Sequence, residues 1–226
     1  MLRKIPKGWW AVVIGLAVIV IDQIIKIAVK TSFYWGEDVE IFPWFHLKFI
    51  QNNGMAFGME MGPKLFLTLF RVVVVGLLIW YLCRLCKSAK TPLGYICTIA
   101  LITAGAFGNI IDCVFYGEIF TNPLPPEIAT FVPWGHGYAD LFHGLVVDMF
   151  YFPLFSFVWP EWMPFVGGNE FSFFDPVFNF ADASICVGIF ILLIKYYRYL
   201  GGDKDKKEDA RTETAQEELA ESSEND

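Results

Sequence analysis

Charged residues are scarce in this sequence and lie unevenly along it. They make up 18% of the 226 residues, whereas hydrophobic residues make up 55%. From Thr91 to Ile194 the chain contains no lysine or arginine. A soluble domain needs a more polar surface than this composition supplies. The sequence therefore predicts an integral membrane protein.

The sequence also lacks a cysteine framework and an internal repeat. Its five cysteines lie within or at the edges of apolar runs, where cysteine behaves as a small hydrophobe. Cys83 and Cys86 form a CxxC pair without the second pair that a structural zinc site needs. Disulfide-stabilised and zinc-stapled folds are therefore not expected.

Four long apolar runs predict four membrane-spanning helices. They lie at about 9–29, 65–82, 93–114 and 180–200, and each is close to the roughly 20 residues that cross a bilayer. The first run is too long for a signal peptide and lacks a small-x-small cleavage site, so we expect a retained helix. The predicted fold class is an all-α integral membrane bundle of four transmembrane helices, with residues 1–200 in a single membrane-embedded domain.

The segments between these runs have distinct compositions. Within the region 31–60, Phe45, Leu47 and Phe49 alternate with polar residues, which predicts a short half-buried strand. After the third run comes an aromatic-rich stretch, in which we expect an interfacial insertion at about 115–145. The tail 201–226 holds ten acidic and four basic residues and is predicted to be disordered.

Basic residues favour one orientation of this bundle. The N-terminus, the turn at 84–90 and the C-terminal flank carry most of the lysines and arginines, whereas the opposite side has only Lys30, Lys48 and Lys64. By the positive-inside rule, both termini are cytoplasmic. The segments 31–64 and 115–179 then face outward.

Polar residues within the predicted spans gather toward the outer leaflet. Asp22 and Lys26 are four residues apart and can pair on one helix face, which suits a helix-locking ion pair as well as a substrate contact. Asn109 suits helix packing as well as a site, and Asp112, near a helix end, suits a solvated carboxylate.

Asp148 and Asp182 are harder to explain structurally, because each follows an apolar approach without a basic partner nearby in sequence. Two carboxylates in one apolar site hold a single proton between them. The ionised member can take a proton from water while the protonated member hydrogen-bonds a carbonyl oxygen. This pair predicts an aspartic peptidase with its active site near the outer leaflet.

Five sequence blocks resemble those of lipoprotein signal peptidase, or signal peptidase II, an aspartic peptidase family of the bacterial inner membrane. The blocks are Asp22–Lys26, Asn52–Phe57, Gly105–Asp112, Val146–Phe150 and Phe178–Asp182. Their order and their placement among four apolar runs agree with the family across residues 9–200.

The resemblance implies cleavage of prolipoproteins on the N-terminal side of a cysteine that carries diacylglycerol, with Asp148 and Asp182 as the catalytic pair. It implies a small extracytoplasmic β-cradle beside the four helices. Residues expected to bind substrate or support the pair are Asn52, Gly54, Asn109, Asp112 and Asn179, together with Asp22 and Lys26. Expected partners are the lipidated substrate, membrane lipid and the cyclic peptide antibiotics that inhibit the family. We expect a monomer that binds no nucleic acid and needs no cofactor or metal.

The sequence departs from the family pattern at two places. An arginine directly follows the Asp of the third block in the family, and here that position is Cys113. Lys26 or Arg71 are candidates to replace it. The link from Cys113 to Leu145 is also much longer than in the family.

Two other readings remain open from the residues. His136, Asp140 and His143 would share one face of a helix and could bind zinc in a metal-dependent membrane hydrolase. Alternatively, the buried Asp and Lys residues could form an ion path in a non-catalytic, transporter-like protein, although the absence of a repeat argues against it.

Overall fold

The computed structural model describes residues 6–52, 64–153, 155–173 and 176–200. The expectations for Gly54 and for the acidic tail lie outside these residues. The chain forms two compact units, residues 1–189 and residues 190–226. The first contains the sheet and every described candidate site residue. The described part of the second comprises the last turns of α5 (Phe180–Lys195) and α6 (Tyr197–Leu200).

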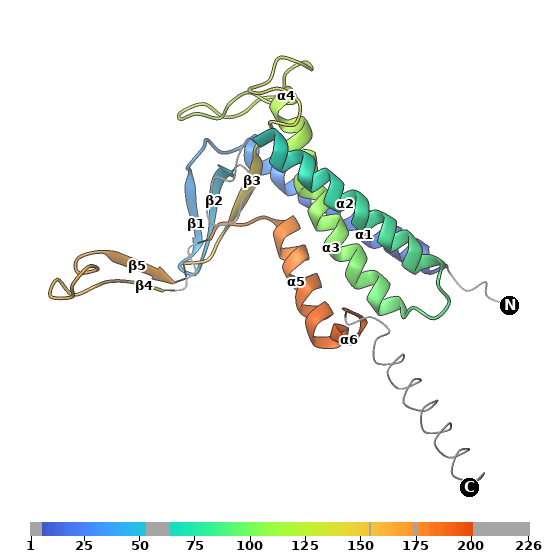
Figure 1. Cartoon of the computed structure of the whole chain (residues 1–226). Coiled ribbons are helices and arrows are strands. Elements are labelled where there is room, and N and C mark those ends of the chain that lie inside the picture. The colour runs from blue at the N-terminus through green and yellow to red at the C-terminus, as the bar shows by residue number, and fades with distance from the viewer. Residues whose placement is uncertain (1–5, 53–63, 154, 174–175, 201–226) are drawn as a thin grey trace, which may run out of the picture. The chain divides into compact units, whose positions relative to one another are not determined.

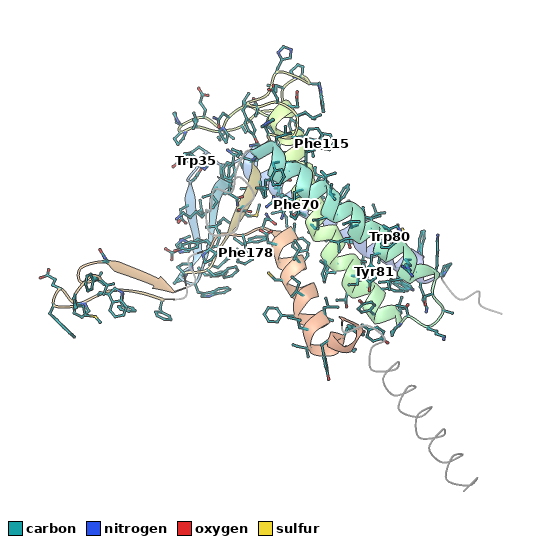
Figure 2. The ribbon with its side chains drawn as sticks, viewed as in Figure 1. Trp35, Phe70, Trp80, Tyr81, Phe115 and Phe178 are labelled. Carbon is teal, nitrogen blue, oxygen red and sulfur yellow. The ribbon has the colours of Figure 1, made fainter. Side chains whose placement is uncertain are left out.

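Within the described residues, three helices are long and apolar enough to cross a membrane. They are α1 (Lys7–Lys30), α2 (Lys64–Lys87) and α3 (Leu93–Ile111) with its continuation to Ile119. The 24 residues of α1 span about 36 Å, more than the roughly 30 Å of hydrocarbon in a bilayer. Phe70 and Trp80 on α2 are largely exposed, as lipid-facing side chains are (Figure 2). The protein is thus a helical, membrane-type protein.

The third helix continues beyond its expected end near Val114. It runs without a break into a π-helix, η2 (Asp112–Tyr116), and then into one turn of α-helix, α4 (Gly117–Ile119). Short π-helical turns inside α-helices are rare and occur frequently at functional sites. This one begins at Asp112, a predicted site residue.

Two glycines let α3 make close contacts on one face. A Cβ atom on Gly105 would lie 2.5 Å from the carbonyl oxygen of Ala181, at the start of α5. A Cβ atom on Gly108 would lie 2.8 Å from Oδ2 of Asp22 on α1. Residues three apart share a helix face, so α3 receives both α1 and the first turn of α5 there.

A small antiparallel sheet adjoins the helices (Figure 1). Its strands are β1 (Asp38–Phe42), β2 (Phe45–Asn52) and β3 (Val146–Tyr151), in that order. The strand expected from the alternation at residues 45–49 is therefore present as β2. Ile50 on β2 pairs with Asp148 on β3, so the register places a predicted catalytic residue within the sheet. A separate hairpin joins β4 (Phe155–Val158) to β5 (Glu170–Phe173).

The segment from Phe120 to Leu145 has turns and bends without a regular helix or strand. Its backbone returns along the end of the third helix: Tyr138 donates to the carbonyl of Phe120 (3.0 Å) and Gly144 to that of Cys113 (2.9 Å). Gly144 approaches the backbone of Asp112 so closely that a Cβ atom would collide with it. This segment, which we call the inserted segment, is thus packed against η2.

The expected fourth span corresponds to α5, which has 16 residues and a length of about 24 Å. The helix breaks at Tyr196, where the apolar run gives way to Lys195 and a tyrosine-rich stretch. Three helices rather than four therefore reach the length of a span within the described residues.

Candidate active site

Asp148 and Asp182 come from different elements that the backbone joins. Asp148 lies in β3 and is 1% exposed, whereas Asp182 lies in the first turn of α5 and is half-buried. Phe178, just before α5, exchanges two backbone hydrogen bonds with Phe150 of β3, at 2.8 and 3.0 Å. Figure 2 shows Phe178 at this junction. The start of α5 is therefore tied to the strand that carries Asp148.

Asn179 connects the two carboxylates. Its Nδ2 donates to Oδ1 of Asp148 (2.6 Å), while its Oδ1 accepts the backbone N–H of Asp182 (2.9 Å). The Asn179 N–H in turn donates to Oδ2 of Asp182 (3.3 Å). This reciprocal pattern is a capping box, in which the residue before a helix and the third helical residue satisfy each other. The sequence that starts α5 thus also places Asp182.

Asn109 on α3 supports the same pair from the other side. Its Nδ2 donates to Oδ1 of Asp182 (2.7 Å), and its Oδ1 accepts from Asn179 (3.1 Å) and from Lys26 (2.7 Å). Asn109 is therefore a polar link between α1 and Asp182 rather than only a packing residue.

Lys26 is fully buried among acceptors. Its Nζ lies 3.0 Å from Asp22, as the spacing predicted, and 2.9 Å from Asp112. With Asn109, these acceptors use all three N–H groups of the ammonium. All three N–H groups of Lys26 are thus engaged inside this cluster. Asp112 is also fully buried, so the reading of it as a solvated carboxylate was wrong.

Asp22 and Asp112 also hold the backbone beside the candidate catalytic residues. Oδ1 of Asp22 accepts the N–H of Ala181 (2.9 Å), and Oδ2 of Asp112 accepts the N–H of Val147 (3.2 Å). Ala181 and Val147 directly precede Asp182 and Asp148. The buried cluster of Asp22, Lys26 and Asp112 therefore holds the backbone directly before both candidate catalytic residues.

Gln23 completes this network, and the sequence reading did not select it. Its Nε2 donates to Oδ2 of Asp22 and to Oδ1 of Asp112, both at 3.1 Å. The sequence did contain a signal for Gln23, because it is an amide side chain next to an aspartate inside an apolar run. Asn52 at the end of β2 donates to Oδ2 of Asp148, as expected of a supporting residue.

The environment of Asp148 favours its protonated form. Burial raises the pKa of this carboxyl well above its usual range, and the nearby charge of Asp182 raises it further. The hydrogen bond from Asn179 opposes the rise, because it stabilises the ionised form. A carboxyl group whose protonated form is favoured in this way is suited to donating a hydrogen bond.

Comparison with known proteins identifies the family. The family model for signal peptidase (SPase) II matches residues 14–198. The chain belongs to the signal peptidase II family. The lipoprotein signal peptidase of Porphyromonas gingivalis is 48% identical over 197 residues, 87% of each chain. That of Amoebophilus asiaticus is 34% identical over 194 residues, 83% of this chain and 78% of the relative.

Solved structures agree on the fold of this signal peptidase II family member. Two bacterial membrane enzymes match it with TM-scores of 0.57 and 0.53, at 24% and 25% identity. The matches cover 86% and 82% of this chain and 90% and 93% of the solved chains. The members of this family are proteases. The apolar helices described above agree with the membership of this chain in the family.

This signal peptidase II chain has Cys113 at the position where the family has an arginine. Cys113 is buried, and Nη1 of Arg71 lies 3.6 Å from its Sγ. Of the two candidates for the missing cation, Arg71 is therefore the one that reaches this place.

The hypothesis of a zinc site required a helix through His136, Asp140 and His143. The structure has turns and bends there instead, because Gly135, which has a positive φ of 81°, and Gly137 flank His136. Within the described part of the chain, no group of three or more His, Cys, Asp or Glu side chains could hold a metal ion.

Proposed function

We propose that this protein is an aspartic endopeptidase that removes signal peptides from diacylglyceryl-modified prolipoproteins, cutting on the N-terminal side of the lipid-modified cysteine. The observation that carries the proposal is the bridge between Asp148 and Asp182 through one buried side chain, Asn179. Membership in the signal peptidase II family supports the substrate class.

Asp148 and Asp182 divide the chemistry between them. Ionised Asp182 takes a proton from the water that attacks the scissile carbonyl carbon, and protonated Asp148 donates a hydrogen bond to the carbonyl oxygen. When the tetrahedral intermediate collapses, the C–N bond breaks and a proton passes to the leaving nitrogen. The products are a carboxylic acid and an amine, with one proton again shared between the two aspartates.

The surroundings suit a substrate that remains in the bilayer. The proposed arrangement has four membrane spans, including α5, with both termini in the cytoplasm and the dyad near the outer leaflet. The clustering of basic residues at the termini and the 84–90 turn supports this orientation. The lipid of the substrate then stays among acyl chains while its peptide reaches the carboxylates.

Replacing either carboxylate with its amide tests the mechanism. Asp148→Asn and Asp182→Asn keep the side-chain shape, and each should reduce cleavage of a lipidated prolipoprotein by purified enzyme about 100-fold or more. Asp140→Asn is the matched control, because Asp140 is exposed and outside the site. Normal cleavage by either site variant would disprove the mechanism, and loss of wild-type cleavage on chelation would favour a metal enzyme.

A further inference from the structure

Lys30, the last residue of α1, is fully buried among four aromatic rings. Its Nζ lies 4.9 Å from the ring centroid of Tyr138, 5.3 Å from that of Phe120, and 6.0 Å from those of Phe49 and Tyr116. The Nζ also donates a hydrogen bond of 2.5 Å to Oε1 of Gln51. We call these four rings the aromatic cage.

The aromatic cage takes the place of a counter-ion. Among the described residues, no carboxylate lies within ion-pair distance of Lys30. Ring faces attract a cation through their negative electrostatic potential, and more strongly away from water. One turn earlier, Lys26 neutralises only one of the two buried carboxylates that it contacts. In its ammonium form, Lys30 supplies the second positive charge that, together with Lys26, would balance ionised Asp22 and Asp112.

The cage joins parts of the chain that are far apart in sequence. Phe49 belongs to β2 and Tyr116 to η2, whereas Phe120 and Tyr138 belong to the inserted segment. A single side chain of α1 therefore contacts β2, η2 and the inserted segment at once. The inserted segment shares one apolar cluster with β3, in which Phe120 and Ala129 pack with Val147 and Met149.

Three contacts lead from the cage to the candidate active site. The hydroxyl oxygen of Tyr138 accepts the N–H of Leu145 (2.7 Å), directly before β3. The Tyr116 hydroxyl donates to Oε1 of Gln23 (3.0 Å), within the Asp22 and Asp112 network. Gln51, which Lys30 contacts, precedes Asn52, the residue that donates to Asp148.

We propose that Lys30 is a positioning residue for the peptidase reaction: it fastens the inserted segment and β2 together, and so holds Asp148 and its hydrogen-bond donors in place. This role rests on the proposed function. It also gives the inserted segment a purpose, because two walls of the cage and the anchor for the start of β3 come from it.

Lys30→Met tests the proposal, because methionine keeps an unbranched apolar stem and removes the charge and the donor. We expect kcat to fall at least tenfold while KM for a lipidated prolipoprotein changes less than twofold. Lys48→Met is the matched control: Lys48 is half-exposed and lies 5.0 Å from the ring centroid of Tyr151, and its loss should leave kcat unchanged. Lys30→Arg should recover part of the rate, since a guanidinium also binds ring faces.

The pH profile separates positioning from a general loss of structure. Asp148 faces Asp182 on α5, Lys26 on α1 and Asp112 on η2, besides its amide donors. Loosening Asn52 removes a donor that favours ionised Asp148, so the alkaline limb of kcat should move to higher pH in Lys30→Met. A fall in activity that only follows the folded fraction, with an unchanged pH profile, would overturn the proposal.

Tyr138→Phe provides a second test if Lys30→Met fails to fold. It keeps the ring of the cage and removes only the oxygen that accepts the Leu145 N–H. We expect a smaller fall in kcat, about threefold, with the same direction of pH shift, and wild-type behaviour would overturn the proposal. Activity of Asp148→Asn in the same assay would instead refute the proposed function, so the two failures are distinguishable.

Discussion

Asn179 affects the two candidate catalytic carboxylates in different ways. Its amide nitrogen donates to Asp148, and its amide oxygen fixes the backbone of Asp182. Serine is a good residue at the position before a helix, yet it is too short to reach Asp148 in the same way. Asn179→Ser therefore separates the donor to Asp148 from the start of α5.

We expect Asn179→Ser to move the alkaline limb of the kcat profile to higher pH. The Asn179 hydrogen bond lowers the pKa of Asp148, so its removal raises this pKa and keeps Asp148 protonated to higher pH. The kcat at the optimum should fall about tenfold. Rate profiles of purified enzyme from pH 5 to pH 10 measure both effects. A limb that stays in place or moves to lower pH would contradict this account of Asp148.

The burial of Asp148 also predicts a stability effect. Burial raises its pKa above the unfolded value, which is about 3.9. Between these two pKa values the native state binds more protons than the unfolded state, so the free energy of unfolding falls as pH rises. Asp148→Asn lacks this term. Relative to that of the wild type, its Tm should rise by at least ~2 °C between pH 4 and pH 8 in matched thermal melts.

At the scale of the elements, Gly108 of α3 determines how closely α1 can approach. A Cβ atom on Gly108 would lie 2.8 Å from Oδ2 of Asp22, whereas one on Gly76 in α2 would meet nothing within 4 Å. Gly108→Ala should therefore lower the free energy of unfolding by about 1–3 kcal/mol and reduce cleavage. Gly76→Ala is the matched control, which should preserve cleavage without lowering the free energy of unfolding. Thermal melts and cleavage assays of the two variants in the same detergent make the comparison.

The sequence alone predicted the elements that depend on local pattern. The apolar runs marked the helices, and the alternation at residues 45–49 marked β2. The blocks around Asp148 and Asp182 marked two segments that the structure joins through Asn179. The predictions of the helices and of β2 succeeded because hydrophobic periodicity acts over a few residues.

The contacts of the third helix and of Lys30 depend on the tertiary structure. Near the end of an apolar run, Asp112 had the pattern of a solvated carboxylate, and its burial follows from Lys26 on another helix. Lys30 directly follows the first apolar run, which predicted a basic residue just outside the membrane. In the structure, aromatic rings from three distant segments surround it. No local pattern reports that a buried charge will find its partners across such distances.

At the scale of the whole molecule, the distribution of basic residues predicts which loops face the cell exterior. Glu127 lies in the inserted segment and Ala89 in the turn between α2 and α3, and both are exposed. In intact spheroplasts, a membrane-impermeant maleimide should label Glu127→Cys and leave Ala89→Cys unlabelled until the membrane is opened. The parent protein controls for its five cysteines. The opposite labelling pattern would place the dyad at the inner leaflet and contradict the proposed orientation.

The capping box at the start of α5 has an electrostatic consequence as well as a geometric one. The aligned peptide dipoles of a helix place roughly half a positive charge at its N-terminus, and this charge favours anions in the first turn. Asp182 occupies that turn, whereas Asp148 lies in a strand, and strands have little net dipole. The fold thereby makes two chemically identical side chains unequal before any substrate arrives. In the proposed dyad, the helix dipole therefore acts at the Asp182 carboxyl group, while the burial that raises the pKa of Asp148 acts at the other one.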